Sequence, residues 1–135
     1  MSRPTVERLD DLPAHCVRPL GVLAPASLRQ WADQAQHRYV EIDCSGLQDR
    51  KAVLTAIGRA LGFPDWYGAN LDALYDCLTD LPQERPAPGW VLLLLRLPYT
   101  ADFDVEARDA LIDVFRDAAE HFADEGMALR VFYTS

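Results

Sequence analysis

Residues 64–81, Pro-Asp-Trp-Tyr-Gly-Ala-Asn-Leu-Asp-Ala-Leu-Tyr-Asp-Cys-Leu-Thr-Asp-Leu, are the most informative stretch of the sequence. They predict a helix that follows Asn70 as its N-cap, because at about 100° per residue they sort into two faces. One face carries the leucines Leu71, Leu74, Leu78 and Leu81, and the other carries Asp72, Tyr75, Asp76 and Thr79. The leucine face predicts attachment to a core. The acidic face suits a cationic partner.

Charge is distributed unevenly along the 135 residues, whose formal net charge is −8. Residues 1–59 carry seven acids and eight bases, whereas residues 60–135 carry fourteen acids and five bases. This balance argues against a nucleic-acid binder or an anionic-membrane binder, because Lys and Arg hold phosphate groups. The negative field belongs to the half of the chain that holds the two-faced helix, where it favours capture of a basic partner.

Apolar patterns on both sides of this helix predict a small α/β domain over residues 38–135. The expected strands are 39–43, 90–96 and 128–134, and the other expected helices are 49–61 and 104–123. Strands separated by helices of this length indicate right-handed crossovers, and hence a three-stranded parallel sheet flanked by helices. The proline-rich residues 81–89 are expected to form a loop.

Residues 1–37 are interpreted as an N-terminal extension that packs on or flanks this domain. Within it, Val17–Leu23 favours a short strand, and Pro19 would suit a sheet edge. Pro25–Gln36 favours a helix with Pro25 in its first turn. The extension is therefore able to add one strand and one helix to the domain.

Nothing in the sequence indicates a cofactor, a metal site or a membrane segment. The three cysteines and three histidines lack metal-ligand spacing, and no phosphate-binding glycine loop occurs. The N-terminus lacks the apolar run of a signal peptide, and the longest apolar run, 90–95, is too short for a bilayer. We expect a cytoplasmic protein with reduced cysteines.

Three interpretations of the acidic face remain open from the residues alone. Asp72 and Asp76 form either an acid/base pair, part of an ordinary solvated face, or part of a protein interface. Two carboxylates on adjacent turns of one helix lie on the same side of any substrate, which disfavours catalysis. Tyr75 between the acids, together with the nearby Trp66 and Tyr67, favours an interface, because aromatic residues are enriched in binding hot spots.

The run from Leu61 to Thr79 resembles the central motif of the barstar family, intracellular inhibitors of barnase-like ribonucleases. The likeness extends over residues 38–135, in which the predicted strands and helices follow the family's order. It implies a small parallel sheet flanked by helices. It also implies a non-enzymatic inhibitor that binds one basic ribonuclease, extracellular or toxin-like, in a 1:1 complex and is monomeric when free.

The resemblance also implies roles for individual residues. Asp76 matches the aspartate that enters the ribonuclease active site in place of an RNA phosphate, and Asp72 matches a second interface acid. Asp117 matches an acid that faces the enzyme's basic rim. The other matching contact positions are Trp66, Gly68, Asn70, Leu71, Tyr75 and Thr79.

The chain departs from the family pattern at several positions. Tyr75 stands in place of a tryptophan, Asp117 in place of a longer glutamate, and Leu81 in place of an exposed tryptophan. Residues 1–37 and extra residues around 121–125 have no counterpart. The alternative function is therefore a barstar-like module whose basic partner is not a nuclease.

Overall fold

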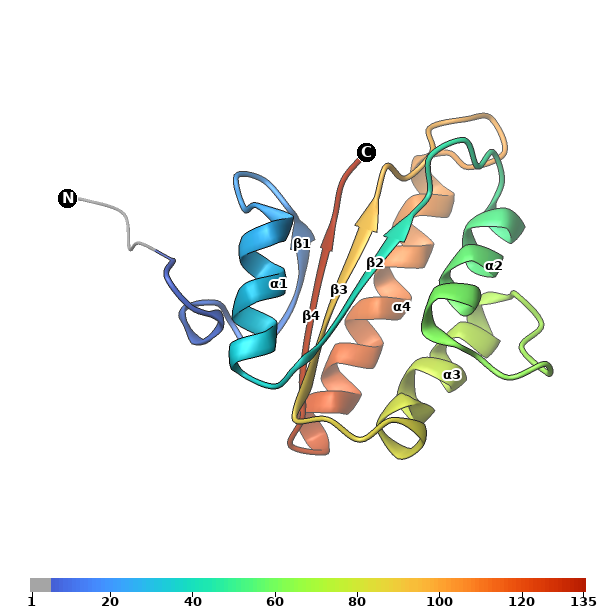
Figure 1. The fold of residues 1–135 in the computed structure, drawn as a ribbon. Coiled ribbons are helices and arrows are strands. Elements are labelled where there is room, and N and C mark those ends of the chain that lie inside the picture. Colours follow the sequence, from blue (N-terminus) through green and yellow to red (C-terminus); the bar gives the residue numbers. More distant parts are fainter. Residues whose placement is uncertain (1–5) are drawn as a thin grey trace.

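Four parallel strands form one sheet in the order β1-β4-β3-β2 (Figure 1). The structure is a computed structural model that describes residues 6–135, so the first five residues of the predicted extension lie outside it. The strands are β1 (His15–Pro19), β2 (Arg38–Asp43), β3 (Gly89–Leu95) and β4 (Ala128–Tyr133). The predicted α/β class with a parallel sheet flanked by helices is confirmed. The predicted number of three strands is wrong, because β1 joins the sheet as a fourth.

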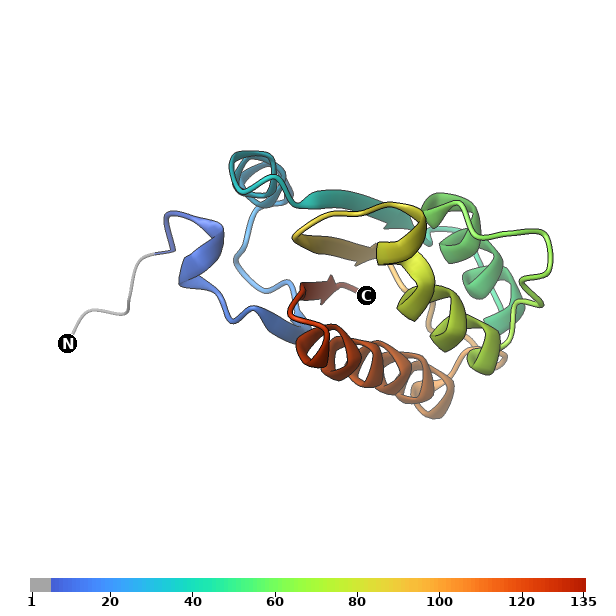
Figure 2. The ribbon, with the colours of Figure 1, turned by 90° about the horizontal axis from the view of Figure 1, so that it is seen from below.

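Helices cover both faces of this sheet (Figures 1 and 2). The helices are α1 (Pro25–Gln34), α2 (Arg50–Leu61), α3 (Leu71–Glu84) and α4 (Val105–Asp124), with a short 3₁₀ turn η1 (Leu9–Asp11) before β1. The second, third and fourth helices lie on one face, whereas α1 and η1 lie on the other. The protein therefore has three layers.

The central strand β3 is apolar without alternation because both of its faces are covered. Trp90, Leu92 and Leu94 belong to the core beneath α2, α3 and α4. Val91 and Leu93 point to the opposite face, where they pack in a smaller core with residues of α1 and η1. Every one of these five side chains is at most 1% exposed.

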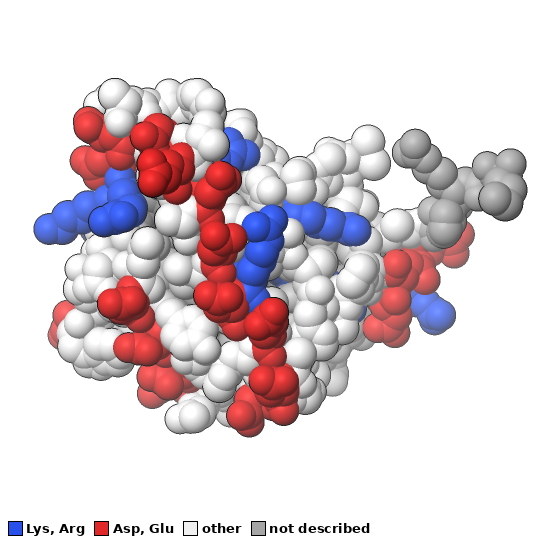
Figure 3. Space-filling model, turned by 180° about the vertical axis from the view of Figure 1, so that it is seen from behind, with Lys and Arg blue, Asp and Glu red and all other residues white. Residues whose placement is uncertain are grey.

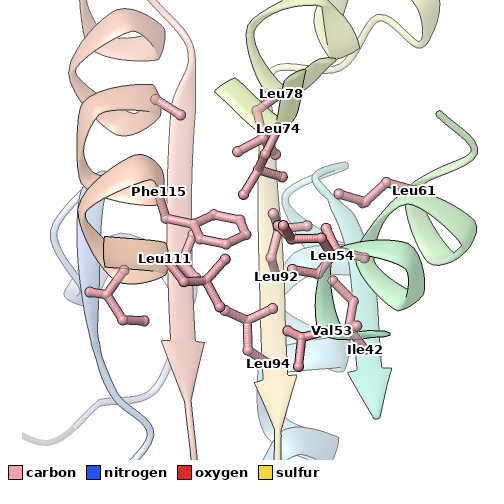
Figure 4. Close-up of a cluster of buried hydrophobic side chains, with 14 of the residues drawn as sticks. Ile42, Val53, Leu54, Leu61, Leu74, Leu78, Leu92, Leu94, Leu111 and Phe115 are labelled. Atoms are coloured by element: carbon pink, nitrogen blue, oxygen red, sulfur yellow. The ribbon is translucent and has the colours of Figure 1, made fainter. Parts of the chain in front are cut away.

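The larger core holds α2, α3 and α4 against the sheet (Figure 4). Val53 and Leu54 come from α2, Leu74 and Leu78 from α3, and Phe115 from α4. All five are 0% exposed. The leucine face predicted for the third helix is thus buried at these positions, and the opposite face of the helix is left toward solvent.

The strand of the N-terminal segment begins earlier than the sequence predicts. It runs over His15–Pro19, not over 17–23, and pairs with β4 from His15 opposite Leu129 to Pro19 opposite Tyr133. Pro19 stands at the end of an edge strand, where its missing N–H costs no hydrogen bond within the sheet. The division of the chain near residue 37 into an extension and a domain stays a prediction.

The predicted loop over 81–89 is partly wrong, because α3 continues through Pro82 to Glu84. A proline removes one backbone N–H from the hydrogen-bond ladder of a helix. Here it lies in the last turns, where Leu81 is only 3% exposed and so fixes the helix to the core. The Arg85 N–H then donates to the Leu81 carbonyl at 2.8 Å and closes the helix.

Burial of Leu28 in the smaller core predicts that α1 contributes to the stability of the fold. Leu28 is 0% exposed beneath the sheet, so Leu28→Ala should lower the free energy of unfolding by about 2–5 kcal/mol through lost burial and a cavity. Urea denaturation measures this change. Val22→Ala is the matched control, because Val22 is fully exposed and its truncation should change stability by less than about 0.5 kcal/mol. Equal stability of both variants would show that α1 is not part of the cooperative fold.

Candidate functional site

The start of α3 is held in place by two contacts of the preceding loop. The Asn70 side-chain oxygen accepts a hydrogen bond from the Ala73 N–H at 2.8 Å and caps the helix, as predicted. The Tyr67 hydroxyl donates to the Leu54 carbonyl on α2 at 2.9 Å. A Cβ at Gly58 would lie 2.5 Å from the Tyr67 ring, so the ring can pack against α2 only because residue 58 has no side chain. Tyr67 is therefore a structural anchor.

Backbone strain lies between these two anchors. Ala69 has φ of 49°, in the left-handed region that residues with a Cβ rarely occupy. Such a conformation persists only where the surroundings enforce it. Here the Tyr67 contact precedes it and the Asn70 cap follows it. The loop therefore enters α3 in one defined geometry.

The exposed face of α3 carries its acids at defined positions. Asp72 lies in the first turn, where the positive end of the helix dipole stabilises a carboxylate. Asp72 and Asp76 are exposed, and Tyr75 between them is half-buried. The Thr79 hydroxyl donates to the backbone carbonyls of its own helix, at 3.1 Å to both Tyr75 and Asp76, so its proton is already in use.

A groove with a volume of about 660 Å³ lies between the first half of α3 and the second half of α4. Leu71 and Tyr75 of α3 and Val114 of α4 supply its apolar surface. The remaining lining residues are polar and nearly all acidic: Asp72, Asp76, Asp117, Glu120, His121 and Asp124. Two helices thus bring five carboxylates to one concave surface.

Acidic side chains dominate this side of the molecule (Figure 3). Lys and Arg are absent from the lining of the groove. In residues 6–135, none of the five carboxylates of the groove takes part in an ion pair, whereas the nearby Asp113 pairs with Arg116 at 3.2 Å. The groove therefore keeps its negative charge available for a partner.

The structure brings together five of the nine residues expected to bind a partner. Leu71, Asp72, Tyr75, Asp76 and Asp117 all line the groove. The other four, Trp66, Gly68, Asn70 and Thr79, lie outside it. Whether any of the nine contacts a partner stays a prediction.

Trp66 belongs to the other flank of α3. It lines a smaller pocket of about 250 Å³, whose further residues include Cys77, Asp80 and Leu81. The Trp66 side chain is 61% exposed, so most of its ring is available for contact. Gly68 and Asn70 are exposed in the same loop. The surface predicted from the sequence thus spans α3 from one flank to the other.

Sequence reasoning missed three residues of the groove, which are Glu120, His121 and Asp124. Apart from Asp117, the acids of α4 are interpreted from the sequence only as part of the negative field of residues 60–135. The missed signal was helical spacing, because residues 117, 120, 121 and 124 recur at three- and four-residue intervals and share one face. Which helix lies opposite that face is a property of the tertiary structure.

The described residues give little support to a metal site, a reactive cysteine or a membrane-spanning helix. Within residues 6–135, no group of three or more His, Cys, Asp or Glu side chains is placed to hold a metal ion. Burial raises the pKa of the Cys44 and Cys77 thiols to about 11, which keeps them protonated at neutral pH. In the same part of the chain, every helix is too short or too polar to cross a membrane.

An exposed groove of this kind, with unpaired carboxylates beside half-buried aromatic and aliphatic groups, is complementary in charge to a cationic surface. The chain belongs to the family described as "Barstar (barnase inhibitor)", whose model matches residues 37–134. It is also 32% identical over 93 residues to the protein named "Putative ribonuclease inhibitor YrdF" of Bacillus subtilis (strain 168). That match covers 65% of this chain and 92% of the relative. Residues 1–36, which include β1 and α1, lie before the family match.

The hydrogen bond at the N-cap of α3 is expected to stabilise the fold. Asn70→Ala removes the acceptor for the Ala73 N–H and should lower the free energy of unfolding by about 1 kcal/mol. Asn70→Ser keeps a capping oxygen and should lose far less. Urea denaturation of both variants measures the difference. An equal loss in the two would show that the capping hydrogen bond does not stabilise α3.

Proposed function

We propose that this protein inhibits a basic bacterial ribonuclease by inserting the acidic face of α3 into the enzyme's active site. The observation that carries the proposal is the groove in which five carboxylates from two helices meet without ion pairs among residues 6–135. Membership of a family of barnase inhibitors supports the same function. The relative from Bacillus subtilis is likewise named as a ribonuclease inhibitor.

The physical basis is complementarity of charge. An enzyme that cleaves RNA must present cationic side chains to a phosphodiester, and these repel one another when the active site is empty. Carboxylates pair with such cations through charge-assisted hydrogen bonds, which are roughly twice as strong as neutral ones. Asp76 takes the place of the RNA phosphate, and Asp72 pairs with a neighbouring cation. Asp117, on the other helix, meets the basic rim of the active site.

Rigidity of α3 strengthens this binding. The helix is capped by Asn70, preceded by the anchored Tyr67 and buried along Leu74 and Leu78. Little conformational entropy is therefore lost when the acidic face meets its partner. Tyr75 and Trp66 supply apolar contact area on the two flanks of the helix.

The remaining parts of the proposal follow from inhibition by occlusion. The protein binds one ribonuclease per chain, is monomeric when free, and acts in the cytoplasm of the cell it protects. It catalyses no reaction itself and needs no cofactor. Its acidic surface binds no nucleic acid, because phosphate groups and carboxylates repel each other.

Titration into an RNA-cleavage assay with barnase-like ribonucleases tests this function. The wild-type protein should inhibit stoichiometrically. Asp76→Ala should weaken binding by about 2–5 kcal/mol, because it leaves cations of the enzyme unpaired in a desolvated site. Asp33→Ala is the matched control: it removes the same charge from an exposed position on α1, across the sheet, and should inhibit like the wild type.

Competition with a mononucleotide separates active-site inhibition from binding elsewhere. A nucleotide that occupies the active site should slow or prevent binding of the protein. Equal inhibition by Asp76→Ala and the wild type would refute the role of Asp76. Binding that ignores the nucleotide would favour a partner surface away from the active site, and failure to inhibit any ribonuclease would favour a basic partner of another kind.

A further inference from the structure

His121 is the one residue lining the groove that is able to carry a positive charge. It lies in the last turn of α4, and its side chain is half-buried. Within residues 6–135, its ring takes part in no hydrogen bond or ion pair. Neither the position nor the residue type is among those that the family resemblance assigns.

Carboxylates from both helices line the same groove as His121. Asp72 and Asp76 lie on α3, and Asp117, Glu120 and Asp124 lie on α4. The remaining titratable group of the lining is the Tyr75 hydroxyl on α3. Histidine is the side chain that ordinarily changes its charge between pH 5 and 8. Protonation of His121 therefore changes the net charge of the carboxylates and imidazole together from −5 to −4.

We propose that the bound ribonuclease covers the last turn of α4 and that His121 makes its affinity depend on pH. This inference rests on the proposed function. The occupant of this half of the groove is a basic segment of the same enzyme, because the groove is continuous from Asp72 and Asp76 on α3 to Glu120 and Asp124 on α4. Charge complementarity demands Lys or Arg side chains opposite these acids.

The direction of the pH effect follows from linkage. A cationic partner in the groove disfavours the protonated form of His121, since the two positive charges repel each other. Binding therefore releases a proton wherever free His121 is protonated, and affinity falls as the pH is lowered through the titration of this residue. The neutral imidazole does not repel a cationic partner, so the five carboxylates then act alone.

Two substitutions imitate the two charge states of His121. His121→Gln is neutral at every pH, and His121→Lys is positive at every pH below 9. Dissociation constants for an inhibited barnase-like ribonuclease are measured for both variants and the wild type from pH 5.5 to 8. Dividing each value by that of His121→Gln at the same pH removes the titration of the enzyme's own groups. Circular dichroism and thermal unfolding show that each variant is folded.

The ratio of wild type to His121→Gln should be near one at pH 8 and rise to about threefold to tenfold at pH 5.5, the size of one partly screened charge. His121→Lys should be weaker by a similar factor at every pH. His15→Asn, which alters an exposed histidine on β1, should keep the wild-type pH dependence. Ratios that stay at one for both His121 variants would overturn the inference while the proposed function stands. If no ribonuclease binds any variant, the proposed function fails and this inference fails with it.

Discussion

Burial of the leucine face of α3 determines which side chains this helix exposes to solvent. Leu74 and Leu78 are fully buried against the sheet and Leu81 nearly so, which fixes the rotation of the helix about its axis. With that rotation fixed, Asp72 and Asp76 must face solvent on the opposite side. The anchored loop and the Asn70 cap fix where the helix begins, so both its rotation and its position along the axis are set. The acidic face is a consequence of the core.

The carboxylates of the groove lower the stability of the free protein. Five carboxylates that share a surface without ion pairs, among the described residues, repel one another in the free protein. Burial in two cores offsets this repulsion, because β3 is covered on both faces, on one of them by α1, which lies outside the family match. A cationic partner relieves the repulsion on binding. Concentrated unpaired charge is thus a cost to the free protein and a source of affinity in the proposed complex.

Local signals predicted most of the fold correctly, and the errors have identifiable causes. The cap at Asn70 is recognisable because a short polar side chain bonds a backbone N–H group at the start of a helix. The end of α3 was misjudged because Pro82 is a local signal for a loop, whereas burial of Leu81 is a tertiary effect that keeps the last turn helical. The predicted sheet lacks its fourth strand for a similar reason. Its pairing with β4 joins segments more than a hundred residues apart, which periodicity does not encode.

For the candidate site, the sequence by itself determined the acidic face of α3, since helical periodicity places Asp72, Tyr75 and Asp76 together wherever the leucines are buried. It also supplied a motif specific enough to indicate the family. Only the tertiary structure decided that Glu120, His121 and Asp124 complete the same groove, and that Trp66 belongs to the opposite flank of the helix. The physical reason is that periodicity defines the faces of one helix, whereas the packing of α4 beside α3 depends on the shared core that holds both against the sheet.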